Sequence, residues 1–215
     1  MGDGYRQILE GLTALSELQA AGKIRKIGVA GYPLPVLLRL TYLAKSAGIH
    51  LDIVQTYAQQ TIINPSLTAG YLAAFEAAGV AEVTNAAPLA MGILTSSGGP
   101  EWHPARAAGD GIFDACQEAA KLCRERGTSI EEISLNFGYK EVKMRKGNVL
   151  PVVIGCKDIS EIKRSVKQWR EVNVPGARST EETESLGKVE DEVIKLFEER
   201  GVRGISWSSP GEASL

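Results

Sequence analysis

The sequence predicts an α/β fold with parallel strands, and three observations support this prediction. Apolar strand-like segments alternate with helix-like segments at intervals of roughly thirty residues, as in strand–helix–strand units with right-handed crossovers. The strand-like segments are nearly continuous apolar runs, which is typical of strands covered on both faces. Glycine follows several helix-like segments, as is common at helix ends. A doubly wound sheet also fits, but its phosphate-binding turn would here be GVAGYPLP, in which G-x-x-G is too weak a signal.

The first elements are two helices with a strand between them. Residues 5–20 place leucine and isoleucine near helical spacing, and Gly22 ends this helix. KIRKIGVA, residues 23–30, has a basic start and an apolar continuation, which indicates a strand. The segment LPVLLRLTYLAKSAG predicts a helix over 34–47, because the proline in its first turn is tolerated there.

The middle of the chain repeats this alternation. LDIVQTYA, residues 51–58, predicts a second strand. A helix is expected over 66–78, with Ser66 as its N-cap and Gly79 at its end. AEVTNAAPL, residues 81–89, predicts a third strand.

The remaining elements follow a long loop. GIFDACQEAAKLCRER predicts a helix over 111–126. Ser129 and Glu132 form a capping-box pattern before a further helix over 133–139. VLPVVIGC, residues 149–156, predicts the fourth strand. Two more helices are expected, over 158–172 and over 181–199, before a tail rich in glycine, serine and proline.

The charge pattern argues against two classes of partner. The formal net charge is −2, and basic and acidic residues alternate along the chain. This pattern gives no basic patch for nucleic acid or for an anionic membrane surface. No apolar run approaches the roughly 18–20 residues that span a bilayer. We therefore expect neither a nucleic acid nor a membrane as a partner.

The cysteines favour a reducing environment. The three cysteines, Cys116, Cys123 and Cys156, lack the spacing of a metal site. Cys116 and Cys123 are two turns apart on one predicted helix, which is too far for a disulfide. Reduced thiols in a cytoplasmic protein are the expectation, and no metal is expected.

The ends of the predicted strands carry a resemblance to a known family. The segments IRKIGVAGYPL, DIVQTYAQ, PLAMGILT and VLPVVIGCKDISEIKRSV occur in this order. From about Leu9 to Pro210, the chain resembles the last four strand-and-loop units of an aldo-keto reductase. The segments GPEWHPA and ISWSSP are most similar to the galactose and arabinose dehydrogenase branch of that family.

The resemblance implies a fold and a reaction. The family fold is a (β/α)8 TIM barrel, so this chain would be its C-terminal half, an incomplete barrel. That half would comprise four parallel strands with covering helices over 1–175, and a C-terminal helix and tail over 176–215 that pack on it. The family transfers a hydride between NAD(P) and a carbonyl or alcohol, here an aldose sugar or aldehyde. The reacting groups of such barrels lie at the carboxyl ends of the strands.

The resemblance also implies cofactor-binding residues. Gln55 matches the glutamine that holds the nicotinamide carboxamide, because an amide can donate to and accept from another amide. The loop after the fourth strand and the following helix start match the part that receives the adenosine end, where bare N–H groups and a helix dipole suit a phosphate. Ala30-Gly31 stands where the family often has Ser-Asn, and Ala86 replaces an aromatic residue that often stacks on the nicotinamide. The full set of expected cofactor residues is Gln55, Ala30, Gly31, Ala86, Pro88, Leu89, Gly92, Gly155, Cys156, Lys157 and Glu161.

NAD is favoured over NADP. A single lysine, Lys157, beside the carboxylates of Asp158 and Glu161 does not make a convincing clamp for a 2′-phosphate. In the loop after the third strand, Trp102 is a candidate wall for a sugar ring and His103 a candidate substrate contact, although a lone loop histidine is more often structural.

The residues that carry out acid–base chemistry in the family are not found. In the family a tyrosine, a lysine, an aspartate and a histidine from the first four strands do this work, because a phenol with a pKa near 10 needs partners at neutral pH. No tyrosine of this chain matches that tyrosine. The tyrosines in question are Tyr5, Tyr32, Tyr42, Tyr57, Tyr71 and Tyr139. The expectation is therefore a truncated enzyme, inactive by itself, with no catalytic residue of its own.

An incomplete barrel has a physical consequence. Four strands cut from a closed barrel leave two free edges and an uncovered inner face, both of which favour pairing with other chains. A second chain could supply the missing half, or two copies could associate through the exposed edges. The alternative function is thus a non-catalytic module that acts through these edges. An unrelated nucleotide-binding α/β protein would need a phosphate-loop signature, and none is found.

Overall fold

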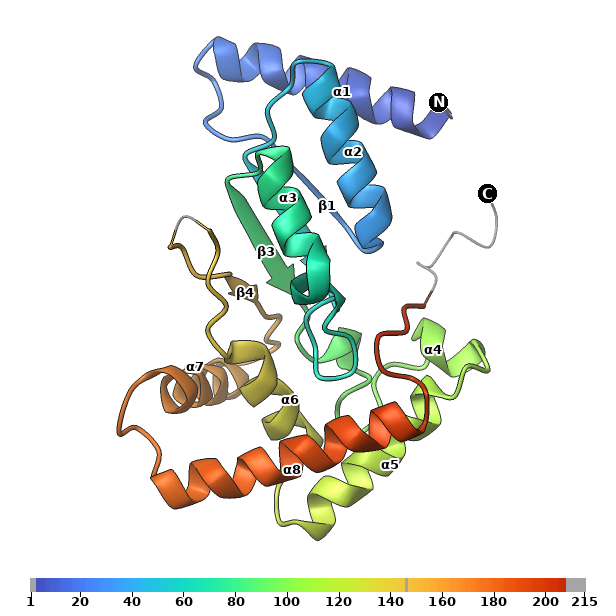
Figure 1. The fold of residues 1–215 in the computed structure, drawn as a ribbon, viewed down its shortest axis with the longest axis vertical. Coiled ribbons are helices and arrows are strands. Elements are labelled where there is room, and N and C mark those ends of the chain that lie inside the picture. The colour runs from blue at the N-terminus through green and yellow to red at the C-terminus, as the bar shows by residue number, and fades with distance from the viewer. Residues whose placement is uncertain (1–2, 146, 208–215) are drawn as a thin grey trace.

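The computed structural model describes residues 3–145 and 147–207 of the chain (Figure 1). Helical and strand elements alternate along it, as the sequence predicts. The helical elements are α1 (Asp3–Ala20), α2 (Leu34–Ser46), η1 (Leu67–Tyr71), α3 (Leu72–Ala78), η2 (Ala90–Gly92), α4 (Pro104–Ala107), α5 (Ile112–Glu125), α6 (Ile130–Tyr139), α7 (Ile159–Asn173) and α8 (Thr180–Glu199). The strands are β1 (Gly28–Gly31), β2 (Ile53–Tyr57), β3 (Glu82–Ala86) and β4 (Val152–Val153).

The four strands form one parallel sheet in the order β1-β2-β3-β4. Each connection between neighbouring strands contains at least one helix, as parallel pairing requires. The sheet is open, with β1 and β4 at its edges. These findings confirm the α/β class and the four parallel strands with helices between them, and they are consistent with part of a (β/α)8 barrel.

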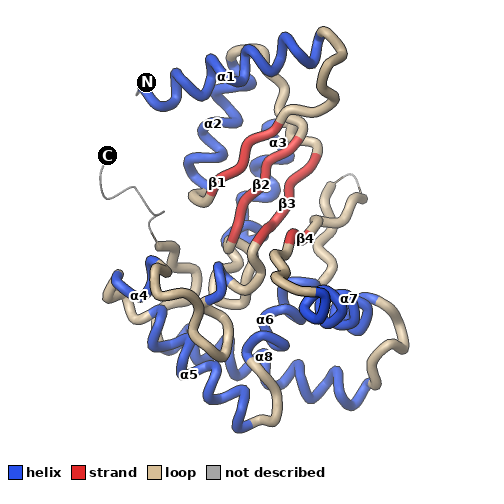
Figure 2. The backbone as a smooth tube through the Cα atoms, turned by 180° about the vertical axis from the view of Figure 1, so that it is seen from behind, coloured by secondary structure: helices blue, strands red, loops and turns tan. Residues whose placement is uncertain are grey.

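Helices cover one face of the sheet. Val54 and Val83 are fully buried and share an apolar cluster with Leu37 of α2 and Phe75 of α3. Because side chains alternate along a strand, the neighbours of Val54 point to the other face. Figure 2 shows that face with no helix in front of the strands.

A second apolar cluster lies beyond the carboxyl ends of the strands. It joins α5, α6 and α8 to the loops that follow β2 and β3, and its centre includes Ile93, Ala119, Ile133, Val193 and Phe197, each with no exposed surface. Figure 1 shows α8 running alongside α5 and α6. This cluster therefore anchors the loops that form the mouth of the half-barrel.

Local expectations for the segment 66–78 and for the fourth strand are wrong. The helix expected over 66–78 is divided at Gly70, whose backbone is not helical, into η1 and α3. Ser66 makes no capping bond; its own N–H instead donates to Asn64 Oδ1 at 3.1 Å. The strand expected over 149–156 shortens to Val152–Val153.

The short β4 has a structural cause. Only β3 pairs with β4, so the ladder depends on one neighbour. The residues before β4 are held elsewhere, because the Leu150 N–H donates to Val142 O at 2.9 Å and Val149 pairs with Lys143. The edge of β4 that faces away from β3 carries no partner strand among the residues described.

The lengths and polarities of the helices were compared with those of a membrane-spanning helix. Within the described parts of the chain, every helix is too short or too polar to cross a bilayer.

Candidate functional site

A hollow lies at the carboxyl end of the sheet. It has a volume of about 670 Å³ and lies between the loop after β3, the start of α6, the loop after β4 and one side of α7. We call it the groove. Its lining residues are Leu89, Thr95, Ser96, Ser97, Ser129, Glu131, Glu132, Leu135, Ile154, Gly155, Cys156, Lys157, Glu161, Arg164, Ser165, Lys167, Gln168 and Glu171.

The groove brings together five of the expected cofactor residues. Leu89 comes from the loop after β3, and Gly155, Cys156, Lys157 and Glu161 come from the loop after β4 and the start of α7. More than sixty residues of chain separate the two segments, and the parallel pairing of β3 with β4 puts both at the same end of the sheet. Pro88 and Gly92 flank Leu89 in the chain but do not line the groove.

Gln55 lies on the uncovered face of the sheet, outside the groove. Ala30 and Thr84 are level with it on the neighbouring strands. Its Oε1 accepts a hydrogen bond from Thr84 Oγ1 at 3.3 Å. Its amide nitrogen makes no hydrogen bond within the described residues, so it is available to a ligand on this face.

The other small residues expected near the cofactor also lie at the ends of strands. Gly31 ends β1, and Ala86 ends β3, level with Tyr57 of β2 and Val153 of β4. Tyr57 follows Gln55 by two residues, so both side chains lie on the uncovered face. The aromatic surface that Ala86 lacks is thus present one strand away, at Tyr57.

The loop after β3 has an unusual backbone. Ala87, Ala90 and Met91 have left-handed φ values of 55°, 48° and 57°, although they are not glycines. Such residues cost free energy and concentrate at functional sites. Gly92 is also left-handed, and a Cβ on Gly99 would lie 2.7 Å from the carbonyl of Gly92. The loop therefore folds back on itself in a way that requires glycine.

Polar side chains hold this loop in place. The carboxylate of Glu131, in the first turn of α6, accepts hydrogen bonds from the N–H and Oγ of Ser96 at 2.8 and 2.9 Å. The guanidinium of Arg106 donates to the carbonyls of Gly98 and Pro100 at 2.9 and 3.0 Å. It also lies over the ring of Phe113, 4.2 Å from the centroid. The loop thus reaches the groove as a fixed wall.

His103 supports the loop from inside. The side chain is only 1% exposed. Its Nε2 lies 3.1 Å from Ala90 O, and its Nδ1 accepts from the Ala105 N–H at 3.2 Å, which caps α4. Burial lowers the pKa of His103, so the neutral ring that these two bonds require is favoured. With both nitrogens occupied, this geometry favours a structural role, and a substrate contact stays a prediction.

Trp102 differs from its neighbour, because its side chain is 64% exposed. It projects from the loop after β3 and its ring lies 6.4 Å from that of His103. An exposed aromatic ring on a fixed loop is compatible with the expected wall for a sugar ring, which stays a prediction.

Trp207 closes an aromatic cluster at the end of β1, and no sequence pattern had assigned it this role. Its indole stacks on Tyr32 with centroids 5.4 Å apart and meets His103 edge-on at 4.8 Å. The main-chain N–H of Trp207 donates to Tyr32 Oη, and burial raises the pKa of that phenol. The sequence did offer one signal for this role: Trp207 is a single large aromatic residue in a tail rich in glycine and serine. Ser208–Pro210 of the ISWSSP segment lie outside the described residues.

The start of α7 differs from the expected phosphate cradle. The Asp158 carboxylate caps the helix by accepting from Ser160 Oγ at 2.6 Å and from the Glu161 N–H at 2.9 Å. These two bonds lower the pKa of Asp158. An anion at this helix terminus would meet a carboxylate that already occupies its donors. The N–H groups of Gly155 and Cys156, just before, make no hydrogen bond within the described residues.

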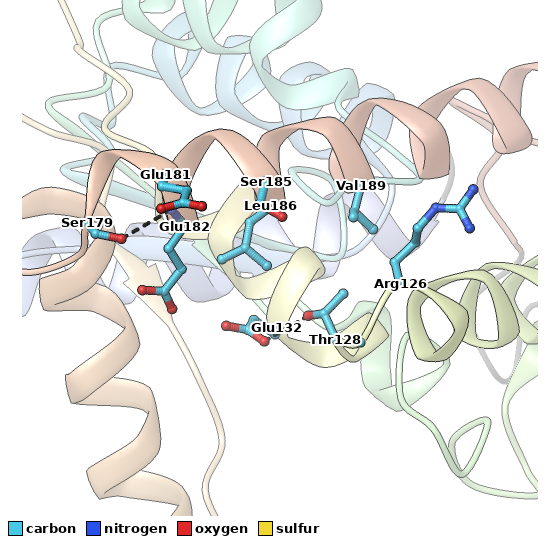
Figure 3. A pocket seen from close by; sticks show the side chains of 10 residues that line it. Arg126, Thr128, Glu132, Ser179, Glu181, Glu182, Ser185, Leu186 and Val189 are labelled. Atoms are coloured by element: carbon cyan, nitrogen blue, oxygen red, sulfur yellow. Dashed lines mark hydrogen bonds between the residues drawn. The ribbon is translucent and has the colours of Figure 1, made fainter.

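A second hollow of about 430 Å³ lies between α8 and the turn that joins α5 to α6. Figure 3 shows the Ser179–Glu182 cap at one end of it and Arg126 at the other. Arg126 forms an ion pair with Glu192 at 2.9 Å, and the remaining charged side chains around this hollow are carboxylates. An anionic ligand is therefore disfavoured here, and the groove is the better candidate.

The fold agrees with comparison to known proteins. The profile of the Aldo/keto reductase family matches residues 2–177. The chain belongs to the aldo/keto reductase family. Residues 2–177 include every expected cofactor and substrate position, from Ala30 to Glu161.

Two curated relatives match most of the chain. It is 29% identical to an L-galactose dehydrogenase of Arabidopsis thaliana over 184 residues, which are 85% of this chain and 52% of that protein. It is 26% identical to a D-arabinose 1-dehydrogenase of Saccharomyces cerevisiae over 209 residues, which are 94% of this chain and 59% of that protein. The chain thus spans little more than half the length of these relatives.

Proposed function

We propose that this chain is the cofactor-binding part of an NAD(P)-dependent oxidoreductase that acts on an aldose sugar or an aldehyde. The observation that carries the proposal is the groove, where Leu89 of one loop meets Gly155, Cys156 and Lys157 of another. A nicotinamide cofactor supplies the hydride acceptor or donor of such a reaction. The chain's own part is to bind and orient that cofactor at the carboxyl ends of the strands.

The residues present fit a dinucleotide in three respects. Gln55 has an amide nitrogen without a partner on the uncovered face of the sheet, where a carboxamide could pair with it. The N–H groups of Gly155 and Cys156 are free to donate to a phosphate. The left-handed loop after β3, which is held by Glu131, forms one wall of the groove and is thus already in place for a ligand.

The choice between NAD and NADP depends on the start of α7. Lys157 Nζ forms an ion pair with Glu161 at 3.2 Å, and the Asp158 carboxylate lies next to it in the chain. A 2′-phosphate at Lys157 would have to displace Glu161 and approach Asp158. NAD is therefore the favoured cofactor of the proposal.

The substrate class of the proposal comes from the two relatives, both named as sugar dehydrogenases. We propose that the tyrosine, lysine, aspartate and histidine of the reaction belong to the first four strands of the family fold. A cytoplasmic location remains an expectation from the reduced cysteines.

A second candidate function is a non-catalytic module that associates through its open sides. One observation favours it: α7 has no buried residue and exposes an apolar stripe of Ile159, Ile162, Val166 and Trp169. These residues recur at helical spacing on one face, and an exposed stripe of this kind marks an interaction surface. Size-exclusion chromatography tests this function, which requires self-association or a bound partner; a monomer at all concentrations counts against it.

Cofactor binding and turnover by the purified chain test the first function. We expect NAD⁺ to bind, as measured by isothermal titration calorimetry, and Gln55→Ala to weaken that binding. We expect no reduction of NAD⁺ or NADP⁺ with L-galactose or D-arabinose present. Oxidation of an aldose by this chain alone would contradict the assignment of the acid–base residues to another part of the fold. Absence of nucleotide binding would contradict the cofactor role of the groove.

A further inference from the structure

Helix α7 packs on the rest of the protein through its polar side. None of its residues is buried, and its apolar side chains Ile162, Val166 and Trp169 are exposed. The partly covered residues of α7 include Ser165 and Gln168. Among the helices, α7 lies mainly against α6 (Figure 1). Apolar burial, which supplies most of the stability of a helix in a protein, therefore contributes little to holding α7 in place.

Hydrogen bonds hold α7 instead. Ser165 Oγ lies 2.5 Å from Tyr139 Oη. The amide of Gln168 donates to Glu132 O at 2.7 Å, and Asn173 Nδ2 donates to Tyr139 O at 3.0 Å. The position of α7 thus depends on polar contacts with α6.

Arg178 brings a positive charge to this contact. It lies in the turn between α7 and α8, and its side chain is only 5% exposed. Its Nη2 donates to Glu171 Oε2 of α7 at 3.0 Å and lies 3.6 Å from Glu132 Oε1 of α6. Its Nη1 donates to Asn136 Oδ1 of α6 at 3.4 Å, and its Nε lies 3.9 Å from Glu182 Oε1 of α8. The guanidinium therefore contacts three helices at once, which the fixed fork of an arginine allows.

The two carboxylates that share Nη2 of Arg178 belong to different walls of the groove. Glu132 lies at the start of α6 and Glu171 near the end of α7, and both line the groove, whereas Arg178 does not. Without the guanidinium, these two carboxylates would repel each other, which favours separation of the walls. Arg178 therefore holds the walls together from outside the groove.

We infer that Arg178 is a positioning residue that clamps α7 to α6 and α8 and thereby sets the width of the groove. It acts through Glu132 and Glu171 and not by contact with a ligand. The identity of the ligand rests on the proposed function, whereas the clamp itself requires no ligand.

Hydrogen exchange of the whole chain, followed by mass spectrometry, tests the clamp without a ligand. We expect Arg178→Ala to speed exchange in α7 about tenfold or more, because hydrogen bonds to a charged group are lost where little apolar burial remains. Exchange in α5, whose buried residues include Ala115 and Ala119, should change by about twofold or less. Arg178→Lys should restore part of the protection, because an ammonium keeps the charge but loses the fork.

Two further variants control this test. Arg170→Ala removes the same charge from an exposed position on α7, and Arg170 forms no ion pair within the described residues. Its exchange should therefore stay within about twofold of the wild type. Glu171→Gln keeps the shape of a partner of Arg178 but removes its charge, and should speed exchange in α7 less than Arg178→Ala does. If circular dichroism shows that Arg178→Ala does not fold, Arg178→Lys and Glu171→Gln carry the test. Equal acceleration of α7 and α5, or no acceleration of α7, overturns the inference.

Calorimetric titration with NAD⁺ separates the inference from the proposed function. We expect Arg178→Ala to weaken binding about tenfold or more, because a displaced wall must be reordered when the ligand binds. Arg178→Lys should weaken it less, and Arg170→Ala should leave it unchanged. Binding that is equal in Arg178→Ala and wild type overturns the inference and leaves the proposed function intact. If the wild-type chain does not bind NAD⁺, the proposed function fails, and the exchange of α7 alone supports or overturns the clamp.

Discussion

Trp207 joins the end of the chain to the mouth of the half-barrel, and its removal should destabilise the protein strongly. The side chain is 4% exposed and contacts the rings of Tyr32 and His103. The segment before it is tied by the Gly204 N–H to Ile63 O at 2.8 Å. Trp207→Ala therefore removes a buried aromatic side chain from a structured site.

The expected loss follows from these contacts. Truncating a buried Trp or Phe to Ala costs about 3–5 kcal/mol. The lower end applies here, because a segment near the end of the described chain can move and partly close the cavity. We expect the free energy of unfolding to fall by about 3 kcal/mol, and the melting temperature by roughly 6–12 °C for a chain of this size.

Trp207→Phe refines the prediction. The indole Nε1 of Trp207 is buried without a hydrogen-bond partner within the described residues. Phenylalanine removes that unpaired donor, which offsets part of the lost ring area, so stability should stay within about 1 kcal/mol of the wild type. Trp102→Ala is the control, because this side chain is 64% exposed and its removal should change stability by about 0.5 kcal/mol or less.

Urea unfolding followed by far-ultraviolet circular dichroism measures these differences. The slope of the unfolding free energy against urea concentration should be the same for all variants. The midpoints of the transitions then report differences in stability alone. If Trp207→Ala unfolds at the same urea concentration as Trp102→Ala, the aromatic cluster does not hold the end of the chain, and the reasoning fails.

Three further predictions concern the groove and its walls. Gly99→Ala should cost more stability than Gly109→Ala, because both positions are left-handed but only a Cβ on Gly99 meets the backbone, at 2.7 Å from Gly92; equal melting temperatures would refute this. In the native protein a thiol reagent should label Cys156 before Cys116, whose burial raises its pKa to about 12, and bound NAD⁺ should slow the labelling of Cys156; mass spectrometry would reveal the reverse order. The pKa of Asp158 is lowered in the folded state, so its charge contributes stability above about pH 4 that is lost as the pH falls through the folded pKa. The difference in melting temperature between wild type and Asp158→Asn should therefore vanish in acid, and a pH-independent difference would contradict it.

Much of the fold could be predicted from local patterns. Ser129 accepts the Glu132 N–H as an N-cap at 3.1 Å, as the capping pattern predicts, because a cap depends on residues three positions apart. The second bond of a capping box does not form, because the Glu132 carboxylate accepts from Thr128 instead. Local sequence thus determined where α6 begins, while competition between nearby donors determined the partner of Glu132.

The site could be predicted less completely. The carboxyl ends of parallel strands meet at one edge of a sheet, so the convergence of Leu89 and Gly155 was predictable from the order of the elements. The burial of His103 and the role of Trp207 were not, because they depend on the contact between a loop and a tail more than one hundred residues apart.

The sequence by itself determined the α/β class, the parallel order of the strands, the family resemblance and the residue types at the ends of the strands. Those properties depend on apolar periodicity and on short motifs, both of which are local. Only the tertiary structure decided that Asp158 closes the helix start to anions and that Trp207 packs against His103. These properties depend on distances between side chains that are brought together by folding, and such distances are not encoded in the spacing of residues along the chain.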